Sequence, residues 1–391
     1  MKVALIAPTY LPARRANTFQ VMKMAQAMVV VGHEVRVAAP TPGLSPHVGG
    51  EVGWDFLAHH YGLQHPFPVE WLAAHPRLRR YDYALHAVQW ARRWEAELLY
   101  TRLPQAAALA SLGGIPTILE VHDLPQGRTG PWIFRGFLKG RGARRLVVIS
   151  HALAADLAQK PGAPDSPPFT VVAPDGVDLE RYENLPSPEE ARKVLWENGR
   201  AERWQADCLV AGYSGHLYSG RGVELLMALA ARLPKVVFLL MGGEPQEIDR
   251  FRDVVIANNL DNVILTGFVP NADLPRYQAA CDLLLMPYQR RVAASSGGDI
   301  ARYLSPMKLF EYLACGRAIL SSDLPVLREV LSPENAVLLP PEDVEAWVTA
   351  IQTLGENPQY RFALAAQARR DARHYSWEER VIRVLGDLPE N

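Results

Sequence analysis

Short aliphatic runs alternate with stretches of helical periodicity along most of the chain. Residues 2–7, 116–121 and 146–150 are rich in Val, Leu and Ile and predict strands, whereas residues 18–31 predict a helix. Residues 40–75 are rich in Pro, Gly and His without periodicity and predict a long loop. Strands that alternate with helices predict an α/β fold with parallel, doubly wound sheets, whose ligands bind beyond the carboxyl ends of the strands.

The same alternation starts a second time at residue 208, after a linker-like stretch with two prolines at residues 185–190. We therefore expect two domains, residues 1–184 and residues 185–391. A C-terminal helix at about residues 374–391 is expected to pack back on the first domain.

One short helix of the second domain has clear signals at both ends. Ser305 is a favourable N-cap, Pro306 suits the first helical position because it lacks an N–H, and Gly316 supplies a left-handed stop. Its apolar face predicts burial in a core and consists of Met307, Phe310, Leu313 and Ala314.

The start of this helix is a candidate phosphate site. A helix N-terminus carries a partial positive charge and unpaired N–H donors, here at Met307 and Lys308. Lys308 and Glu311, three residues apart, are expected to pair beside it, and Asp299 lies in the preceding loop. The alternative is an ordinary surface Lys–Glu pair that binds no ligand.

The turn after the first strand of the second domain is a second candidate phosphate site. Gly215, Gly220 and Gly222 surround two basic residues, His216 and Arg221. Glycines allow the backbone to approach a phosphate closely, and a cation can bind it. The second domain therefore offers two turns that suit a phosphate.

In the first domain, His122 and Asp123 end the strand predicted at residues 116–121. Sheets of this type place ligand-contacting groups at such positions. The alternative is a hydrogen-bonded structural pair.

Charge is unevenly distributed, although the 391-residue chain has a net charge of only −1. Residues 1–145 hold 17 Lys and Arg against 9 Asp and Glu, so the first third is basic and the remainder is acidic. Residues 77–94 and 132–145 interleave Arg with aromatic side chains. Two interpretations stay open: peripheral contact with anionic lipid or acceptor at the inner membrane face, or a solvated face over a core stripe.

Several classes of protein are disfavoured. The loop at residues 8–17 lacks Gly-x-Gly-x-x-Gly, which argues against nicotinamide binding, and a near-neutral chain argues against nucleic acid as a partner. No apolar run approaches the roughly 18 residues of a membrane span. Cys208, Cys281 and Cys315 have no pairing or metal spacing, so we expect a reduced, cytoplasmic protein.

A set of short motifs follows one order along the chain. In the first domain they lie at residues 32–35, 148–150 and 174–178, and in the second at residues 215–222, 265–270, 282–287 and 305–316. In this order the motifs resemble those of the retaining GT-B glycosyltransferases of family 4. Each motif is modest alone, but the ordered set is specific and covers nearly the whole chain.

The resemblance implies an α/β GT-B fold, in which two Rossmann-like, doubly wound domains face each other across a cleft. The second domain would hold a nucleotide-sugar donor and the first an acceptor. His216 and Arg221 match two family cations that hold the diphosphate, and Glu311 matches a Glu that accepts hydrogen bonds from the ribose hydroxyls. Tyr303 stands where the family has a further Glu near the sugar.

In the first domain, His122 resembles the family His that contacts the donor sugar or the acceptor, and Asp123 is expected to orient the acceptor. The expected catalytic residues are thus Arg221, His122 and Lys308. The donor site is completed by Gly215, Gly222, Asp299, Ser305 and Met307.

These residues suit a retaining hexosyl transfer that needs no metal and no cofactor, with the nucleotide sugar as co-substrate. Negative charge grows on the leaving diphosphate, so cations and a helix N-terminus aimed at it lower the barrier. The chain contains no Asp-x-Asp, which argues against the metal-dependent GT-A type. UDP is favoured over GDP, and the acceptor is expected to be a lipid-linked, polysaccharide or small molecule.

Two alternatives remain open from the residues. One is a nucleotide-sugar epimerase or hydrolase of the same fold. The other is a non-catalytic nucleotide-sugar binder, for which Tyr303 in place of Glu is the motive.

Overall fold

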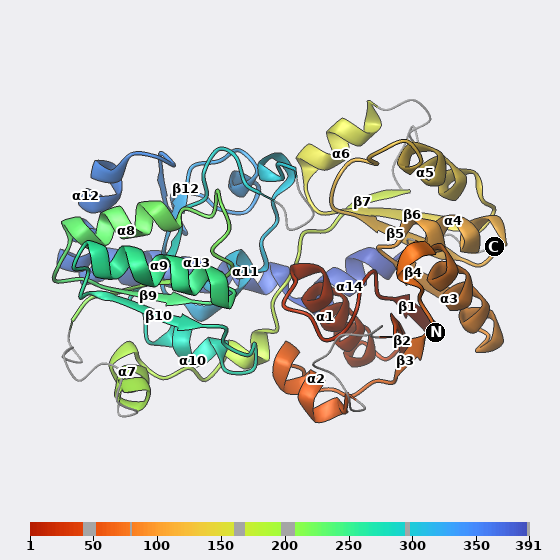
Figure 1. Ribbon diagram of the computed structural model, residues 1–391, viewed down its shortest axis with the longest axis horizontal. Coiled ribbons are helices and arrows are strands. Elements are labelled where there is room, and N and C mark those ends of the chain that lie inside the picture. The colour runs from red at the N-terminus through yellow and green to blue at the C-terminus, as the bar shows by residue number, and fades with distance from the viewer. Residues whose placement is uncertain (42–51, 79, 160–168, 197–207, 294–297, 389–391) are drawn as a thin grey trace. The chain divides into compact units, whose positions relative to one another are not determined.

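The computed structural model describes residues 1–41, 52–78, 80–159, 169–196, 208–293 and 298–388. It consists of two compact units (Figure 1): residues 1–175 together with the segment from Trp377 onward, and residues 176–376. The first unit closes at residue 175, nine residues before the predicted boundary at 184. The last helix, α14 (Trp377–Leu385), belongs to the first unit rather than the second.

The first unit is built on a seven-stranded parallel sheet of order β3-β2-β1-β4-β5-β6-β7. Its strands are β1 (Lys2–Ile6), β2 (Glu34–Pro40), β3 (Val69–Leu72), β4 (Leu98–Thr101), β5 (Thr117–Val121), β6 (Ala143–Val148) and β7 (Thr170–Val172). Its other helices are α1 (Ala16–Val30), α2 (Trp54–Tyr61), α3 (Tyr81–Arg93), α4 (Pro104–Leu112), α5 (Gly130–Lys139) and α6 (His151–Ala158). The strand order reverses between β1 and β4, which is the switch point where such sheets bind ligands.

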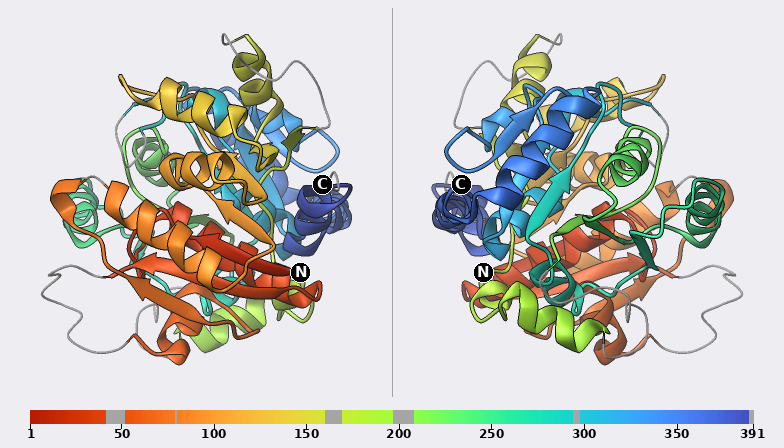
Figure 2. Two further views of the ribbon diagram at one scale, coloured as in Figure 1. Left: turned by 90° about the vertical axis from the view of Figure 1, so that its right-hand side faces the viewer. Right: turned by 90° about the vertical axis from the view of Figure 1, so that its left-hand side faces the viewer.

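Several helices of the first unit pack against one another beside this sheet. Helices α3, α4 and α5 lie side by side, and α14 packs against α1 (Figure 2). The core beneath them is almost entirely aliphatic and aromatic: Ile6, Tyr83, Ala87, Leu99 and Ala106 are fully buried. Hydrophobic burial therefore holds these helices on the sheet.

The predicted loop at residues 40–75 is wrong in part, because it contains α2 and β3; residues 42–51 lie outside the described part. Strand β3 pairs only with β2, at the edge of the sheet. Tyr61 anchors α2: its ring is fully buried against Phe19, and its hydroxyl accepts a hydrogen bond from the Ala13 N–H at 2.9 Å. Long-range contacts, which leave no periodic pattern, hold both elements.

The basic stretch at residues 132–145 does not form one surface. Arg145 is buried, and its guanidinium donates to the carbonyls of Val384 and Gly386, each at 2.6 Å, at the end of α14. A cation at a helix C-terminus satisfies carbonyls that have no partner within the helix. Trp132 and Lys139 of α5 remain exposed.

The second unit contains a six-stranded parallel sheet of order β10-β9-β8-β11-β12-β13. Its strands are β8 (Val210–Ser214), β9 (Val237–Met241), β10 (Val263–Gly267), β11 (Leu283–Met286), β12 (Ala318–Ser322) and β13 (Val337–Leu339). Its helices are α7 (Pro188–Trp196), α8 (Val223–Arg232), α9 (Pro245–Ala257), α10 (Leu274–Ala279), α11 (Met307–Cys315), α12 (Val344–Glu356) and α13 (Pro358–Asp371). The switch point here lies between β8 and β11.

Helix α11 differs from its prediction at the start and agrees at the end. It begins at Met307, so Pro306 is the N-cap residue and Ser305 lies outside the helix. Gly316 is confirmed as the left-handed stop, with φ +63°. Lys308, predicted on a charged surface face, is buried.

None of the helices in the described part of the chain has the length and apolar character that a membrane crossing requires.

We predict that the return of α14 to the first unit stabilises that unit strongly. Trp377 is 1% exposed, so Trp377→Ala should lower the free energy of unfolding by about 3–5 kcal/mol. Trp132→Ala is the matched control, because Trp132 is 72% exposed and its loss should change stability by less than about 0.5 kcal/mol. Chemical denaturation followed by circular dichroism measures both, and equal midpoints for the two variants would contradict the prediction.

Candidate functional site

The turn between β8 and α8 requires glycine at two places that shape the second unit's site. Gly222 has φ +81°, and a Cβ atom there would lie 1.8 Å from the Pro287 carbonyl oxygen. Gly215 has φ +136°, and a Cβ atom there would lie 2.8 Å from the Lys308 Nζ atom. The turn therefore packs directly on the segment after β11 and on α11.

Arg221, from this turn, is held by an aromatic ring. Its Nη1 donates to the Tyr288 hydroxyl at 3.0 Å, and its guanidinium lies 5.3 Å from the centre of the same ring. Tyr288 is buried just beyond β11. The sequence motif at residues 282–287 ends one residue before this tyrosine, so pattern reasoning missed it.

Lys308 is the most unusual group in the second unit. Its Nζ atom lies 3.7 Å from the centre of the Tyr213 ring and 5.2 Å from that of Tyr288. Within the described residues, this ammonium finds no hydrogen-bond acceptor. Burial, and then the charge of Arg221, lower the pKa of Lys308 well below its usual value. A buried amine without an acceptor is costly unless an anion arrives to pair with it.

The predicted pair of Lys308 with Glu311 is wrong. Glu311 instead accepts hydrogen bonds from Asn271 Nδ2 and Gln278 Nε2, both at 3.3 Å. Arg181 Nη1 in turn donates to Asn271 Oδ1 at 2.7 Å. Helical spacing brings positions 308 and 311 onto adjacent parts of α11, but packing turns the lysine inward toward Tyr213.

The remaining predicted donor residues have different surroundings. His216 stacks on Tyr218, with ring centres 4.6 Å apart. Asp299 accepts hydrogen bonds from the N–H groups of Val292 and Ala301, which lower the pKa of this exposed carboxyl and hold its loop. These hydrogen bonds within the loop explain the position of Asp299.

Three further positions surround the start of α11. Tyr303 is buried at the end of a 3-10 turn (Ala301–Tyr303). Ser305 and Met307 are half-buried on either side of Pro306. In the second unit, the structure thus brings Gly215, Arg221 and Lys308 together around two tyrosine rings.

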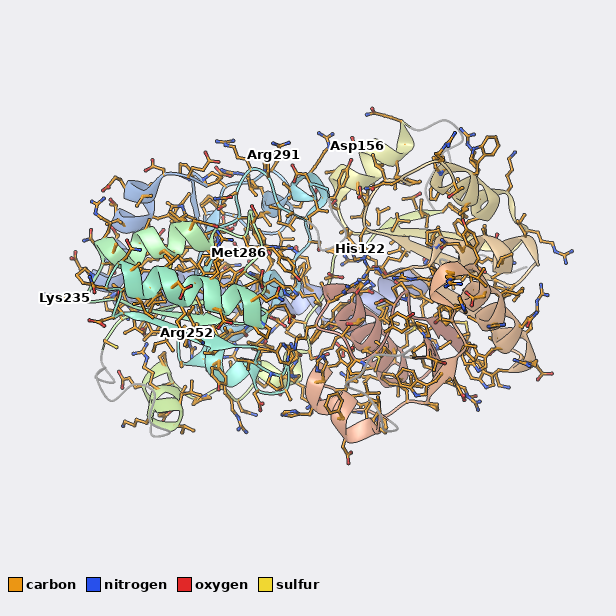
Figure 3. The ribbon with its side chains drawn as sticks, in the orientation of Figure 1. His122, Asp156, Lys235, Arg252, Met286 and Arg291 are labelled. Carbon is orange, nitrogen blue, oxygen red and sulfur yellow. The ribbon has the colours of Figure 1, made fainter. Side chains whose placement is uncertain are left out.

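In the first unit, His122 follows β5 directly, at the carboxyl edge of the sheet. Figure 3 labels His122 and also Met286, which is the last residue of β11 in the second unit. His122 Nε2 lies 2.5 Å from Glu120 Oε1. Burial, and then the charge of Arg102, lower the pKa of His122 to about 4. Its imidazole is therefore neutral at physiological pH.

His122 lines a pocket of about 310 Å³ that lies wholly in the first unit. The polar part of the wall includes Arg102, Gln105 and Asp123, and the apolar part includes Leu124 and Phe134. Asp123 accepts a hydrogen bond from the Leu124 N–H at 2.7 Å and another from Gln126 Nε2. The pocket offers donors, acceptors and an apolar wall to a small polar group carried on a less polar body.

Glu120, which also lines the pocket, is the centre of a buried polar cluster. Its carboxylate accepts hydrogen bonds from Gln20 Nε2 and Arg380 Nη2, each at 2.9 Å, and from the Tyr100 hydroxyl. Burial alone would raise the pKa of Glu120, but Arg380 and His122 hold it well below its usual value. No sequence signal pointed to this cluster, because Gln20 and Arg380 lie far from Glu120 along the chain.

Ligand atoms of Glu120, His122 and Asp175 lie within 4.8 Å of one another, close enough to share a metal ion. The chemistry fits poorly, because Arg380 and His122 already occupy Glu120 Oε1 and a guanidinium repels a divalent cation. Burial raises the pKa of Asp175 to about 7. The negative charge of Glu120 is thus balanced by the guanidinium of Arg380.

Comparison with known families matches two models to the two units. The model described as "Glycosyltransferase Family 4" matches residues 19–181, and that described as "Glycosyl transferases group 1" matches residues 208–357. The chain belongs to glycosyltransferase family 4. This family 4 chain is therefore a glycosyltransferase that uses a nucleotide-sugar donor.

Among curated relatives, this family 4 member is 24% identical to a phosphatidyl-myo-inositol mannosyltransferase of Mycolicibacterium smegmatis, over 96% of this chain and 90% of the relative. It is 29% identical to a 2-deoxystreptamine glucosyltransferase of Streptomyces kanamyceticus, over 64% of this chain and 63% of the relative. One relative is named for a lipid acceptor and the other for a small cyclitol.

Solved structures agree on the fold. Sucrose-phosphate synthase from Thermosynechococcus elongatus superposes with a TM-score of 0.72 at 20% identity, over 98% of this chain and 96% of that one. HepE of Anabaena, solved with UDP and glucose, superposes with a TM-score of 0.73 at 19% identity, over 99% of this chain and 100% of that one. The predicted GT-B fold, with two Rossmann-like parallel-sheet domains, is confirmed.

We predict that Asp175 makes stability depend on pH. The folded state keeps this carboxyl protonated up to about pH 7, whereas an unfolded chain releases the proton near pH ~4, so its contribution is present at low pH and lost as pH rises. The Tm of Asp175→Asn should therefore rise relative to that of the unaltered chain between about pH 5 and about pH 8.5. Asp55→Asn, at an exposed carboxyl of the same unit, is the control. Parallel melting curves for Asp175→Asn and the unaltered chain would contradict the prediction.

Proposed function

We propose that this family 4 enzyme is a retaining, metal-independent hexosyltransferase that transfers a sugar from a UDP-sugar to a lipid-linked, polysaccharide or small-molecule acceptor. The observation that carries the proposal is the buried Lys308 ammonium, which has no acceptor among the described residues and lies near the Gly-rich turn of Arg221. A diphosphate supplies the missing negative charge.

The charges of this site suit the transition state better than the ground state. As the bond from the sugar carbon to the diphosphate breaks, negative charge grows on the phosphate that faces Arg221, Lys308 and the start of α11. Tyr288 holds Arg221 in place before the reaction, which reduces reorganisation during transfer. Glu311, oriented by Asn271 and Gln278, is the proposed partner of the ribose hydroxyls.

UDP is the proposed nucleotide, since the HepE structures, which share this fold, contain UDP or UDP-glucose. GDP is the competing candidate, because one relative is named a GDP-mannose-dependent mannosyltransferase. The 310 Å³ pocket beside His122 is the proposed acceptor site of the first unit. Its apolar wall is compatible with either acceptor class named among the relatives.

Helix α5 is the proposed contact with anionic lipid at the cytoplasmic membrane face. Trp132 is exposed, and the Arg135 guanidinium lies 5.8 Å from its ring centre. The same helix contributes Ile133 and Phe134 to the wall of the pocket. A lipid-linked acceptor bound through α5 would therefore bring its polar end close to His122.

The nucleotide is identified by a thermal-shift panel of UDP, GDP and their sugars. The preferred nucleotide at ~100 times its dissociation constant should stabilise the chain by about 2.7 kcal/mol. Lys308→Met should abolish this shift while leaving the ligand-free chain at least as stable, because a buried amine without a hydrogen-bond acceptor among the described residues is removed. Lys235→Met, at an exposed lysine of the same unit, should keep the shift. An unchanged shift in Lys308→Met would refute the diphosphate site.

Steady-state kinetics separate the roles of Arg221 and Glu311. Ribose hydroxyls keep their charge during transfer, so Glu311→Gln should mainly weaken nucleotide affinity, by about 1–3 kcal/mol. Arg221→Ala should also lower kcat, and its loss should not add to that of Lys308→Met, since the two cations share Tyr288 and the same phosphate. An intact kcat in Arg221→Ala with abolished kcat in Glu311→Gln would reverse these assignments. Arg252→Ala, on an exposed face, is the control.

Co-sedimentation with anionic vesicles tests the role of α5. Trp132→Ala should weaken salt-sensitive binding, whereas Phe362→Ala, which removes an exposed aromatic ring from the second unit, should not. If the unaltered chain fails to bind vesicles at low salt, the surface of α5 is ordinary solvated surface.

A further inference from the structure

Arg380 of α14 is buried at 3% exposure inside the first unit, where its guanidinium faces several hydrogen-bond acceptors. Its guanidinium donates to Glu120 Oε1 at 2.9 Å, to the Pro174 carbonyl at 2.8 Å and to the Ala173 carbonyl at 3.1 Å. A guanidinium cannot lose its proton in a protein, so it keeps the facing carboxylate ionised.

An ionised Glu120 can only accept hydrogen bonds. The His122 Nε2 atom lies 2.5 Å from Glu120 Oε1, so this nitrogen must carry the hydrogen and donate it. In a neutral imidazole the other nitrogen, Nδ1, then has a free electron pair and can only accept. The carboxylate thus selects one of two tautomers of a residue that lines the 310 Å³ pocket.

We propose that Glu120 and Arg380 are positioning residues: they fix His122 as the Nε2–H tautomer, so that Nδ1 accepts a hydrogen bond from a hydroxyl group of the sugar or acceptor bound in the pocket. The identity of that ligand rests on the proposed function. The last helix of the chain thereby sets the chemical state of a pocket residue that lies 258 positions earlier.

The other charged groups around the imidazole support an orienting role rather than a basic one. Arg102 lowers the pKa of His122, and a carboxylate oxygen of Asp175 lies within 4.8 Å of a His122 ring nitrogen. With its pKa near 4, the imidazole is too weak a base to keep a proton at neutral pH. The ligand hydroxyl group therefore keeps its proton. Its hydrogen bond to His122 Nδ1 fixes the orientation of the hydroxyl oxygen.

The tautomer can be read directly by nitrogen NMR of the full chain labelled with ¹⁵N-histidine. The His122 signal is identified by its absence in His122→Gln. We expect a protonated Nε2 and an unprotonated Nδ1 at neutral pH, and a mixture of tautomers in Glu120→Gln, because an amide can either donate or accept. In Arg380→Met, the pKa of His122 should rise, because Glu120 loses its cation and a protonated imidazole replaces it.

Kinetics with the identified nucleotide sugar supply the second measurement. Glu120→Gln should lower kcat by about tenfold or more with the donor KM unchanged, because an unfixed imidazole is often in the wrong tautomer. Arg383→Met, three residues further along α14 and exposed, should leave both the NMR signals and kcat unchanged. If Arg380→Met does not fold, the double variant Glu120→Gln/Arg380→Met removes both buried charges, and it should show the same mixture of tautomers.

An unaltered His122 tautomer in Glu120→Gln would overturn this inference, and so would a kcat loss matched by Arg383→Met. Because the NMR measurement needs no transfer, the two proposals fail separately. A chain with a fixed tautomer that is inactive on every nucleotide sugar would refute the proposed function alone. An active chain with a mixed tautomer would refute this inference alone.

Discussion

A charge taken out of water must find an opposite charge or enough hydrogen bonds, and the two units differ in whether they supply these partners. In the first unit, the charge of Glu120 is balanced from within by Arg380, supported by Gln20 and Tyr100. In the second unit, Lys308 is surrounded by aromatic rings without an acceptor in the described part of the chain. The first arrangement balances a buried charge within the unit, whereas the second leaves the Lys308 amine without a hydrogen-bond partner among the described residues.

Parallel sheets concentrate both arrangements where ligands bind. All strands of a parallel sheet end along one edge, so the groups that follow β5 lie at the same edge as the switch point of the first unit. Those that follow β8 and β11 lie beside the switch point of the second unit. The cores that pack against the two sheets are mainly aliphatic and aromatic. Candidate residues such as His122 and Arg221 therefore follow the carboxyl ends of strands.

The aromatic residues of the second unit have a role beyond core packing. Tyr213 and Tyr288 present ring faces to Lys308, and the Tyr288 hydroxyl also accepts a hydrogen bond from Arg221. Ring faces stabilise a cation partly, but less than an anion does. The rings and the hydrogen bond to Tyr288 thus hold the side chains of Arg221 and Lys308 in place near each other.

The sequence by itself determined the features that depend on local periodicity and backbone conformation. These are the alternation of strands and helices, the two-domain plan, the glycine stop at Gly316, the glycine turn around Arg221 and the place of His122 after a strand. Only the tertiary structure decided which side chains meet: Arg380 with Glu120, Asn271 with Glu311, and Lys308 with Tyr213 instead of Glu311. Local patterns encode direction and spacing within one element, whereas the partner of a buried polar group comes from an element far away in sequence, and packing of the apolar core chooses it.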